Sequence, residues 1–167
     1  QHPDTPQGVS RRAFLAGAAV LVGTVVAART VAAQTATNHK VQMLNKGSNG
    51  QAMQFEPAFL KIAPGDTVTF VPTDKGHNSE AILDMISEGG EPWKGKINEE
   101  ITVAFAQEGV FGFKCLPHFA LGMVGIIQVG ESVAGLEKAQ TAKLPGKAKA
   151  RMQELVAEAG GGAAPAN

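Results

Sequence analysis

Cysteine is almost absent from this sequence, and the one copy, Cys115, excludes any disulfide within the chain. Excess charge of one sign is also missing, since 15 basic side chains balance 15 acidic ones and leave no net charge to attract nucleic acid. Hydrophobic residues make up 44% of the chain, which is typical of a globular protein rather than a disordered or membrane-spanning one. The length of 167 residues fits a single domain once the ends are set aside.

Long apolar runs are also missing, except for one near the start. Residues 10–15 (SRRAFL) resemble a twin-arginine export signal, with Ala16 where lysine is usual. The uncharged run that follows is too short and too rich in Ala and Gly to span a membrane comfortably, and residues 31–33 (VAA) supply a cleavage site. We therefore predict that residues 1–33 are a cleaved export signal, and that the protein reaches the periplasm without membrane insertion. The alternative, a hydrophobic N-terminal helix of the domain, is disfavoured because the run lacks polar periodicity.

Export has two consequences for the rest of the chain. Loss of residues 1–33 removes three arginines and one aspartate, which leaves a net charge of −2, so charge effects must come from local patches. The compartment outside the cytoplasm is oxidising, and an unpaired thiol there is at risk of oxidation. Cys115 must therefore be buried or bound to a metal.

Residues 34–130 are the expected domain core, and residues 40–129 within it carry strand and turn signals with little helical period. Residues 66–70 alternate polar and apolar after the turn pair Pro64-Gly65. In residues 109–115, Phe111, Phe113 and Cys115 share one face and Lys114 lies on the other, so we expect the cysteine to point inward. Further strands are expected at residues 41–44, 59–62, 101–105 and 124–129. Short strands at this spacing predict a mainly β domain, a Greek-key sandwich or barrel.

The character of the sequence changes after Gly130. Residues 132–143 and 147–159 are rich in Ala, Lys, Glu and Leu, and a Leu-Pro-Gly turn separates them. We expect two helices within residues 131–159 that pack against one side of the sandwich, followed by a flexible tail at residues 160–167.

Three metal-competent side chains lie within nine residues: Cys115, His118 and Met123, with the spacing C-x2-H-x4-M. Thiolate, imidazole and thioether favour copper or zinc over magnesium or calcium, and the thioether favours copper. His77 follows the 66–72 strand by a short loop and is the expected fourth donor. His2 leaves with the signal, and His39 sits near the mature N-terminus, where chains fray.

Each of these residues has an ordinary interpretation when it is taken alone. A lone histidine is more often a surface or core residue, and a lone methionine is more often core filler. Together with the sole cysteine, and at this spacing, they favour a metal site. A metal-free adhesion or interaction domain would leave the spacing unexplained.

Beyond the C-x2-H-x4-M loop, several short motifs along the chain belong to one known pattern: residues 43–47 (MLNKG), 55–57 (FEP), 63–68 (APGDTV), 72–78 (PTDKGHN), 96–99 (KINE) and 115–125 (CLPHFALGMVG). With these motifs, the chain over residues 38–159 resembles the pseudoazurins, a bacterial branch of the cupredoxin family of blue-copper proteins. The resemblance implies that His77, Cys115, His118 and Met123 hold one type 1 copper per chain. Phe111 stands where the family usually has tyrosine, which leaves the copper site untouched, and residues 160–167 have no clear counterpart. The helical pair distinguishes the chain from plastocyanins, which share the C-x2-H-x4-M loop.

Two residues beside the predicted ligands are expected to support them. Pro117 stiffens the ligand loop by fixing its own φ and restricting the residue before it. Asn78 either ties the two ligand loops together, with its N–H near the Cys115 sulfur, or is simply a turn residue.

By the same resemblance, electrons enter through the edge of His118, which is set in an apolar patch of Phe119, Ala120 and Leu121. The alternative buries those three residues in the core. Lysines around the patch would steer acidic partners, although they could equally be scattered over the surface. The lysines concerned are Lys46, Lys75, Lys94, Lys96 and Lys114.

The predicted function is therefore a monomeric carrier of single electrons, not an enzyme. A multicopper oxidase or a copper nitrite reductase needs a second centre with more histidines, and only His39 is spare. A copper chaperone or storage protein is the alternative, although such proteins usually offer repeated donors on exposed segments. The resemblance implies transient docking with nitrite reductases and c-type cytochromes.

Overall fold

The computed structural model describes residues 35–160. The predicted export signal, its cleavage site and almost all of the predicted tail lie outside these residues. Within the described residues, no helix has both the length and the apolar character needed to cross a membrane.

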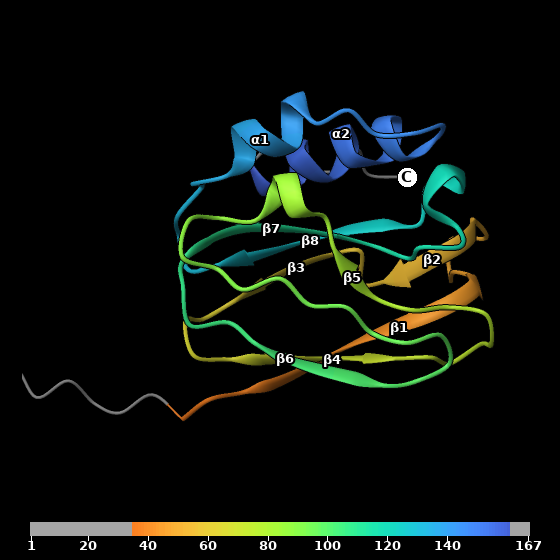
Figure 1. Cartoon of the computed structure of the whole chain (residues 1–167), viewed down its shortest axis with the longest axis horizontal. Helices are drawn as coiled ribbons and strands as arrows, with labels where there is room; N and C mark the ends of the chain where they lie inside the picture. Colours follow the sequence, from red (N-terminus) through yellow and green to blue (C-terminus); the bar gives the residue numbers. More distant parts are fainter. Residues whose placement is uncertain (1–34, 161–167) are drawn as a thin grey trace, which may run out of the picture. The chain divides into compact units, whose positions relative to one another are not determined.

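Two four-stranded sheets make up most of the domain (Figure 1). The first has the order β2-β1-β4-β6 and the second the order β3-β8-β7-β5. Two pairs, β1 with β4 and β3 with β8, are parallel, and the remaining pairs are antiparallel. The predicted mainly β fold with two C-terminal helices is confirmed. The strands are β1 (Asn38–Lys46), β2 (Ala52–Glu56), β3 (Phe59–Ile62), β4 (Thr67–Val71), β5 (Glu80–Ala81), β6 (Ile101–Ala104), β7 (Gly109–Lys114) and β8 (Val124–Val129).

Aromatic side chains fill the core between the sheets. The ring centroids of Phe55 and Phe113 lie 4.7 Å apart, and those of Phe70 and Trp93 lie 5.8 Å apart. Cys115 belongs to the same buried cluster and is fully enclosed, which confirms that it points inward at the end of β7. The alternation along β7 therefore delivers the thiol to the core.

Two helices cover the second sheet on the side away from the first (Figure 1, blue). They are α1 (Leu136–Thr141) and α2 (Ala148–Ala159). Met152 and Leu155 of α2 are buried in a second core cluster together with Ile126 of β8. The first predicted helix was too long at both ends. Gly135 precedes α1 with φ +91°, and its left-handed conformation delays the start of the helix.

Two strands were missed by the sequence analysis, β2 and β5. The five residues of β2 include only a brief apolar stretch, and β5 has only two residues, so neither shows a readable alternation. Both exist because a neighbouring strand supplies their hydrogen bonds: β2 pairs with β1, and β5 pairs with β7. Two short 3₁₀ helices, η1 (Leu83–Met85) and η2 (Phe119–Leu121), complete the fold.

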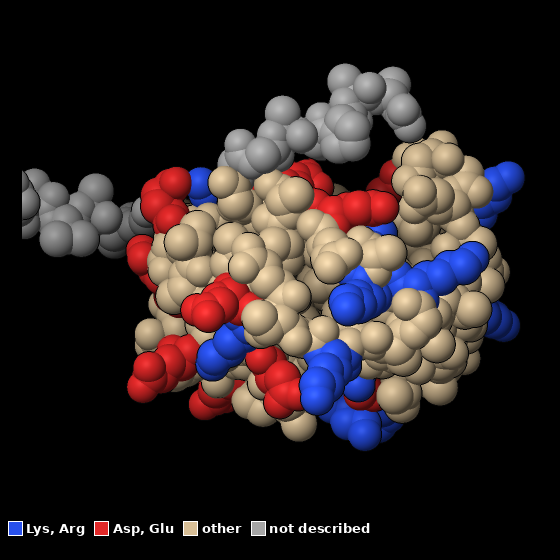
Figure 2. Space-filling view, turned by 90° about the horizontal axis from the view of Figure 1, so that it is seen from above, with Lys and Arg blue, Asp and Glu red and all other residues tan. Residues whose placement is uncertain are grey.

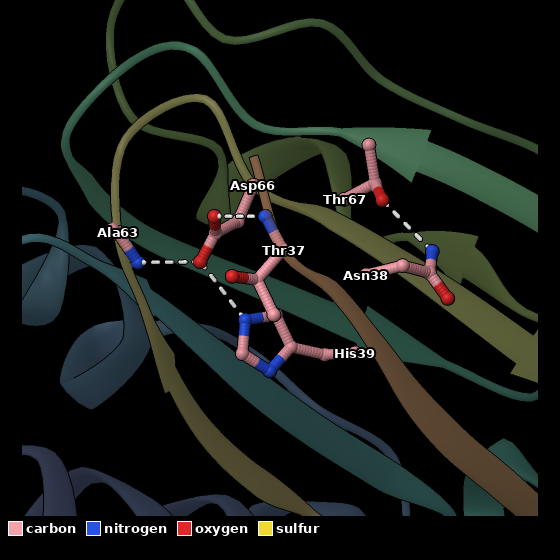
Figure 3. A network of polar contacts seen from close by, with 6 residues as sticks. All are labelled: Thr37, Asn38, His39, Ala63, Asp66 and Thr67. Carbon is pink, nitrogen blue, oxygen red and sulfur yellow. Dashed lines mark hydrogen bonds and ion pairs between the residues drawn. The ribbon is translucent and has the colours of Figure 1, made fainter. Parts of the chain in front are cut away.

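The expectation that His39 lies in a frayed segment was wrong, because β1 begins at Asn38 and holds it (Figure 3). The Asp66 carboxylate accepts hydrogen bonds from the backbone N–H groups of Thr37 at 2.8 Å and Ala63 at 3.1 Å. His39 Nε2 lies 2.9 Å from Asp66 Oδ2, the same oxygen that accepts the Ala63 N–H. The Thr37 N–H, and then the His39 imidazole, hold the pKa of Asp66 below its ordinary value. The start of β1 is thereby fixed to the turn before β4.

Candidate metal centre

The predicted ligands lie in two loops, His77 between β4 and β5 and the other three between β7 and β8. His77 follows β4, Cys115 follows β7 directly, and Met123 directly precedes β8. The loop from Cys115 to Met123 folds back on itself, since the Cys115 N–H donates to the Met123 carbonyl at 3.0 Å and the Met123 N–H donates to the His118 carbonyl at 3.3 Å. Gly122 ends η2 with φ +96°, a left-handed conformation that suits glycine.

Three donor atoms converge on one point. Cys115 Sγ lies 3.7 Å from His77 Nδ1 and 3.5 Å from His118 Nδ1, and the two nitrogens lie 3.1 Å apart. A thiol and two imidazoles that present the same ring nitrogen make a donor set that suits a soft or borderline metal ion such as copper. The residues present therefore fit the metal that the sequence predicts.

Burial shifts the protonation of two of these groups. Burial lowers the pKa of His77, the nearby His118 lowers it further, and Asp74 opposes the shift. The imidazole of His77 is thus kept in the neutral form that binds metals. Burial raises the pKa of the Cys115 thiol, the backbone N–H groups of Asn78 and His118 oppose this, and the charge of Glu80 adds to it. An enclosed thiolate would therefore need a cation beside it.

Asn45, which the sequence analysis did not single out, orients His77. His77 Nε2 lies 3.0 Å from Asn45 Oδ1. An amide oxygen can only accept, so Nε2 carries the proton and Nδ1 is left with its lone pair facing Cys115. Such a contact fixes both the tautomer and the ring orientation of a metal-binding histidine. In the sequence, Asn45 was marked only by its place within the motif at residues 43–47.

Asn78 ties the two ligand-bearing segments together. The Leu116 N–H donates to Asn78 Oδ1 at 2.8 Å, while Asn78 Nδ2 donates to the carbonyl of Gly95 and to Oε1 of Glu80, both at 3.0 Å. The side chain of Asn78 therefore joins the loop that bears His77 to the loop that bears Cys115, as the first of the two interpretations expects. Pro117 follows Leu116 in the loop and is exposed.

Met123 is fully enclosed and belongs to the same core cluster as Cys115. Its backbone is bonded to both Cys115 and His118, as described above. The structure thus brings three of the four predicted ligands together through their donor atoms and places the fourth in the same loop and the same buried cluster.

The surface beside His118 is apolar. Leu121 is 53% exposed and Ala120 is also exposed, whereas Phe119 is half-buried under the Lys114 ammonium, which lies 4.8 Å from its ring centroid. Leu116, 49% exposed, adds an apolar side chain that the sequence analysis missed. Of the five lysines, Lys114 is half-buried and the other four are exposed.

Charge is unevenly distributed on the face seen in Figure 2. Basic side chains gather at the right, and acidic ones gather at the left. The two views share their horizontal axis, and Figure 1 places η2 (teal) and the β1–β2 turn at the right. On this face, the basic side chains therefore gather at the end where η2 of the ligand loop lies.

Comparisons with known proteins agree with this site. Residues 41–130 match the family described as copper binding proteins, plastocyanin/azurin family. The chain is 52% identical over 123 residues to a pseudoazurin of Paracoccus pantotrophus, covering 74% of this chain and 84% of that protein. It is 47% identical over 139 residues to a putative pseudoazurin of Rhizobium leguminosarum, covering 83% and 91%. The solved structure of a Sinorhizobium pseudoazurin superposes with a TM-score of 0.73 at 49% identity, covering 76% and 99%.

The chain belongs to the plastocyanin/azurin family of copper-binding proteins and, within it, to the pseudoazurins. Members of this group are blue-copper electron carriers, so copper is the metal that the three converging donors fit.

Proposed function

We propose that this protein carries single electrons in the periplasm, with one copper held by His77, Cys115, His118 and Met123. The observation that supports this best is the approach of Cys115 Sγ to the two Nδ1 atoms, at 3.7 and 3.5 Å. Copper bound by these side chains supplies one-electron chemistry, because it alternates between Cu(II) and Cu(I).

The chain's own contribution is a rigid and dry frame. His77, Cys115 and Met123 are fully buried, which keeps water from the donor atoms. Asn45 fixes the ring of His77, and Asn78 fixes the loop that bears Cys115. Donors that are held in place from outside change position little when an electron arrives or leaves, and this favours rapid transfer.

His118 is the proposed port for the electron. It is half-buried, whereas His77 and Cys115 are enclosed, so its imidazole is the ligand edge that a partner can approach. Leu121 and Ala120 beside it offer an apolar surface suited to brief, reversible contact.

The proposed partners are nitrite reductases and c-type cytochromes, with transient docking by a monomer. The gathering of basic side chains at the end that carries the ligand loop supports a partner whose docking surface is acidic (Figure 2). The basic residues that we propose for docking are Lys46 and Lys75, which are exposed, and Lys114, whose ammonium lies over the ring of Phe119.

The two alternatives, an enzyme with a second copper centre and a copper-storage protein, are less well supported than an electron carrier. Among the described residues, His39 is the one histidine outside the site, and it contacts Asp66 at the start of β1. Because β1 and β4 are parallel, His39 lies beside Val68 at the start of β4. His77 follows the other end of that strand, so His39 is not part of the site. The site offers one enclosed donor set rather than repeated exposed donors, which favours a carrier over a copper store.

The test is the visible spectrum of the purified protein with Cu(II). We expect an intense thiolate-to-copper band that is lost in Cys115→Ser and weakened or shifted in His118→Gln. His39→Gln is the matched control and keeps the band. Reversible one-electron voltammetry at one copper per chain separates a carrier from a store. A wild-type protein as pale as ordinary Cu(II) would contradict the proposal.

A further inference from the structure

Glu80 is an acidic residue in an unusual place. Its side chain is buried, with 7% of the residue exposed, in the two-residue strand β5. There it pairs with Lys114, the residue directly before Cys115. Glutamate is rarely buried to this degree unless it is paired, because removing a carboxylate from water is costly.

The charge of Glu80 is not neutralised by an ion pair. Within residues 35–160, the ion pairs involve other acidic groups, and no basic side chain lies within ion-pairing distance of Glu80. Its backbone neighbours across β5 are Lys94 and Lys114, but Lys94 is exposed and the Lys114 ammonium lies over the ring of Phe119. Among the described residues, the one side chain that contacts the Glu80 carboxylate by a hydrogen bond is Asn78, whose Nδ2 donates to Glu80 Oε1 at 3.0 Å.

This contact connects Glu80 to the proposed copper ligands through one side chain. The side-chain amide of Asn78 donates one hydrogen to Glu80 and the other to the carbonyl of Gly95. Its oxygen therefore points away from Glu80 and Gly95. That oxygen accepts the N–H of Leu116, the residue after Cys115. Glu80 therefore helps to fix the amide that holds the cysteine-bearing loop.

The carboxylate is also placed beside the segment that bears Cys115, because Glu80 pairs across the sheet with Lys114, the residue directly before the cysteine. Glu80 and Cys115 are both buried. A charge held in a buried region of low effective dielectric acts on its surroundings with little screening by solvent.

We propose that Glu80 lowers the reduction potential of the bound copper by favouring its oxidised, more positive state. The inference rests on the proposed function, because it requires copper at Cys115. The redox step moves one electron between the partner and the copper, with no bond made or broken. Glu80 gives up neither an electron nor a proton and acts as a positioning residue, through its field and through Asn78.

The test is the reduction potential of copper-loaded Glu80→Gln. Glutamine keeps the shape and an oxygen that can accept from Asn78, so the thiolate band should persist while the potential becomes more positive. Glu137→Gln is the control, because it removes the same charge from an exposed position on α1. We expect its potential to equal that of the wild type.

Equal potentials for Glu80→Gln and Glu137→Gln, with the thiolate band intact in both, would overturn the inference and leave the proposed function standing. Absence of the band from the wild-type protein would instead refute the proposed function. If Glu80→Gln fails to fold or to take up copper, Glu80→Asp and Glu80→Asn form an equivalent pair that differs only in charge. A more positive potential for Glu80→Asn supports the inference, and equal potentials refute it.

Discussion

At the scale of single residues, the site depends on side chains that hold the donor atoms in place. Asn78 connects Leu116, Gly95 and Glu80 through three hydrogen bonds of 2.8 to 3.0 Å. Asn45 holds the ring of His77 in place through one contact, between its Oδ1 and His77 Nε2 at 3.0 Å. Both lie beside the donors rather than among them, so their loss should loosen the frame before it removes a ligand.

We predict that Asn78→Ala lowers the free energy of unfolding of the metal-free protein by about 1–3 kcal/mol, because buried polar groups lose their partners. Urea denaturation measures this change. Gln107→Ala, at an exposed position between β6 and β7, removes a side-chain amide of the same kind and is the control, which should stay within about 0.5 kcal/mol of wild type. A loss no larger than that of the control would show that Asn78 is only a turn residue.

Sequence patterns could select the proposed ligands but not all of the residues that support them. Cys115, His118 and Met123 share one short loop, and His77 is one of few histidines, so a motif and a count were enough to select them. Asn45 and Glu80 act across strand pairs and loop contacts that no linear spacing reveals. Glu80 in particular sits in a strand of two residues, which has no period to read.

At the scale of elements, the start of β1 depends on Asp66 (Figure 3). The Thr37 N–H and the His39 imidazole hold the pKa of this carboxyl below its ordinary 3.8. When the pH falls, the unfolded chain takes up the proton first. The stabilisation is therefore complete above pH 3.8 and is lost as the pH falls through the lower folded-state pKa.

We accordingly predict that wild type and Asp66→Asn differ in free energy of unfolding at neutral pH and that the difference shrinks below pH 3.8. Denaturation at a series of pH values measures it. Asp84→Asn, at an exposed position in η1, is the control and should show no such pH-dependent difference. A gap that stayed constant down to the acid limit would count against the role of Asp66.

The helices belong to the same scale, and their contribution is to packing. Leu155 of α2 is 1% exposed in the cluster against β8. We predict that Leu155→Ala costs about 2–5 kcal/mol of unfolding free energy but leaves the position of the thiolate band unchanged. Leu83→Ala is the control, because Leu83 is 72% exposed. A shifted band in Leu155→Ala would show that α2 also shapes the metal site.

Strand alternation and helix composition predicted most elements because burial on one face leaves a period in the sequence. The prediction failed where another effect decided. Gly135 delays α1, pairing with β1 and β7 creates β2 and β5, and the Asp66 carboxylate orders His39.

At the scale of the whole molecule, balanced totals conceal a separation of charge. The sequence has equal numbers of basic and acidic residues, yet Figure 2 shows them gathered at opposite ends of one face. Composition alone could not reveal this, because residues distant in sequence meet on the surface. The separation would orient the basic end toward an acidic partner before contact.

We predict that Lys75→Gln slows association with a nitrite reductase or c-type cytochrome by a few-fold at low salt, and that the difference fades as ionic strength rises. Stopped-flow electron transfer measures this rate. Lys61→Gln is the control, because Lys61 lies opposite Gln128 at the far end of β8 and pairs with Glu131. Equal rates for the two variants would argue against a basic docking surface.

The central claim is that one copper binds where the Cys115 sulfur and the two Nδ1 atoms meet. Anomalous diffraction at the copper edge, from crystals of the copper-loaded protein, tests it most directly. We predict one peak per chain, within bonding distance of Cys115 Sγ, His77 Nδ1 and His118 Nδ1. A peak beside His39 and Asp66 instead, or no ordered copper near Cys115, would contradict the account.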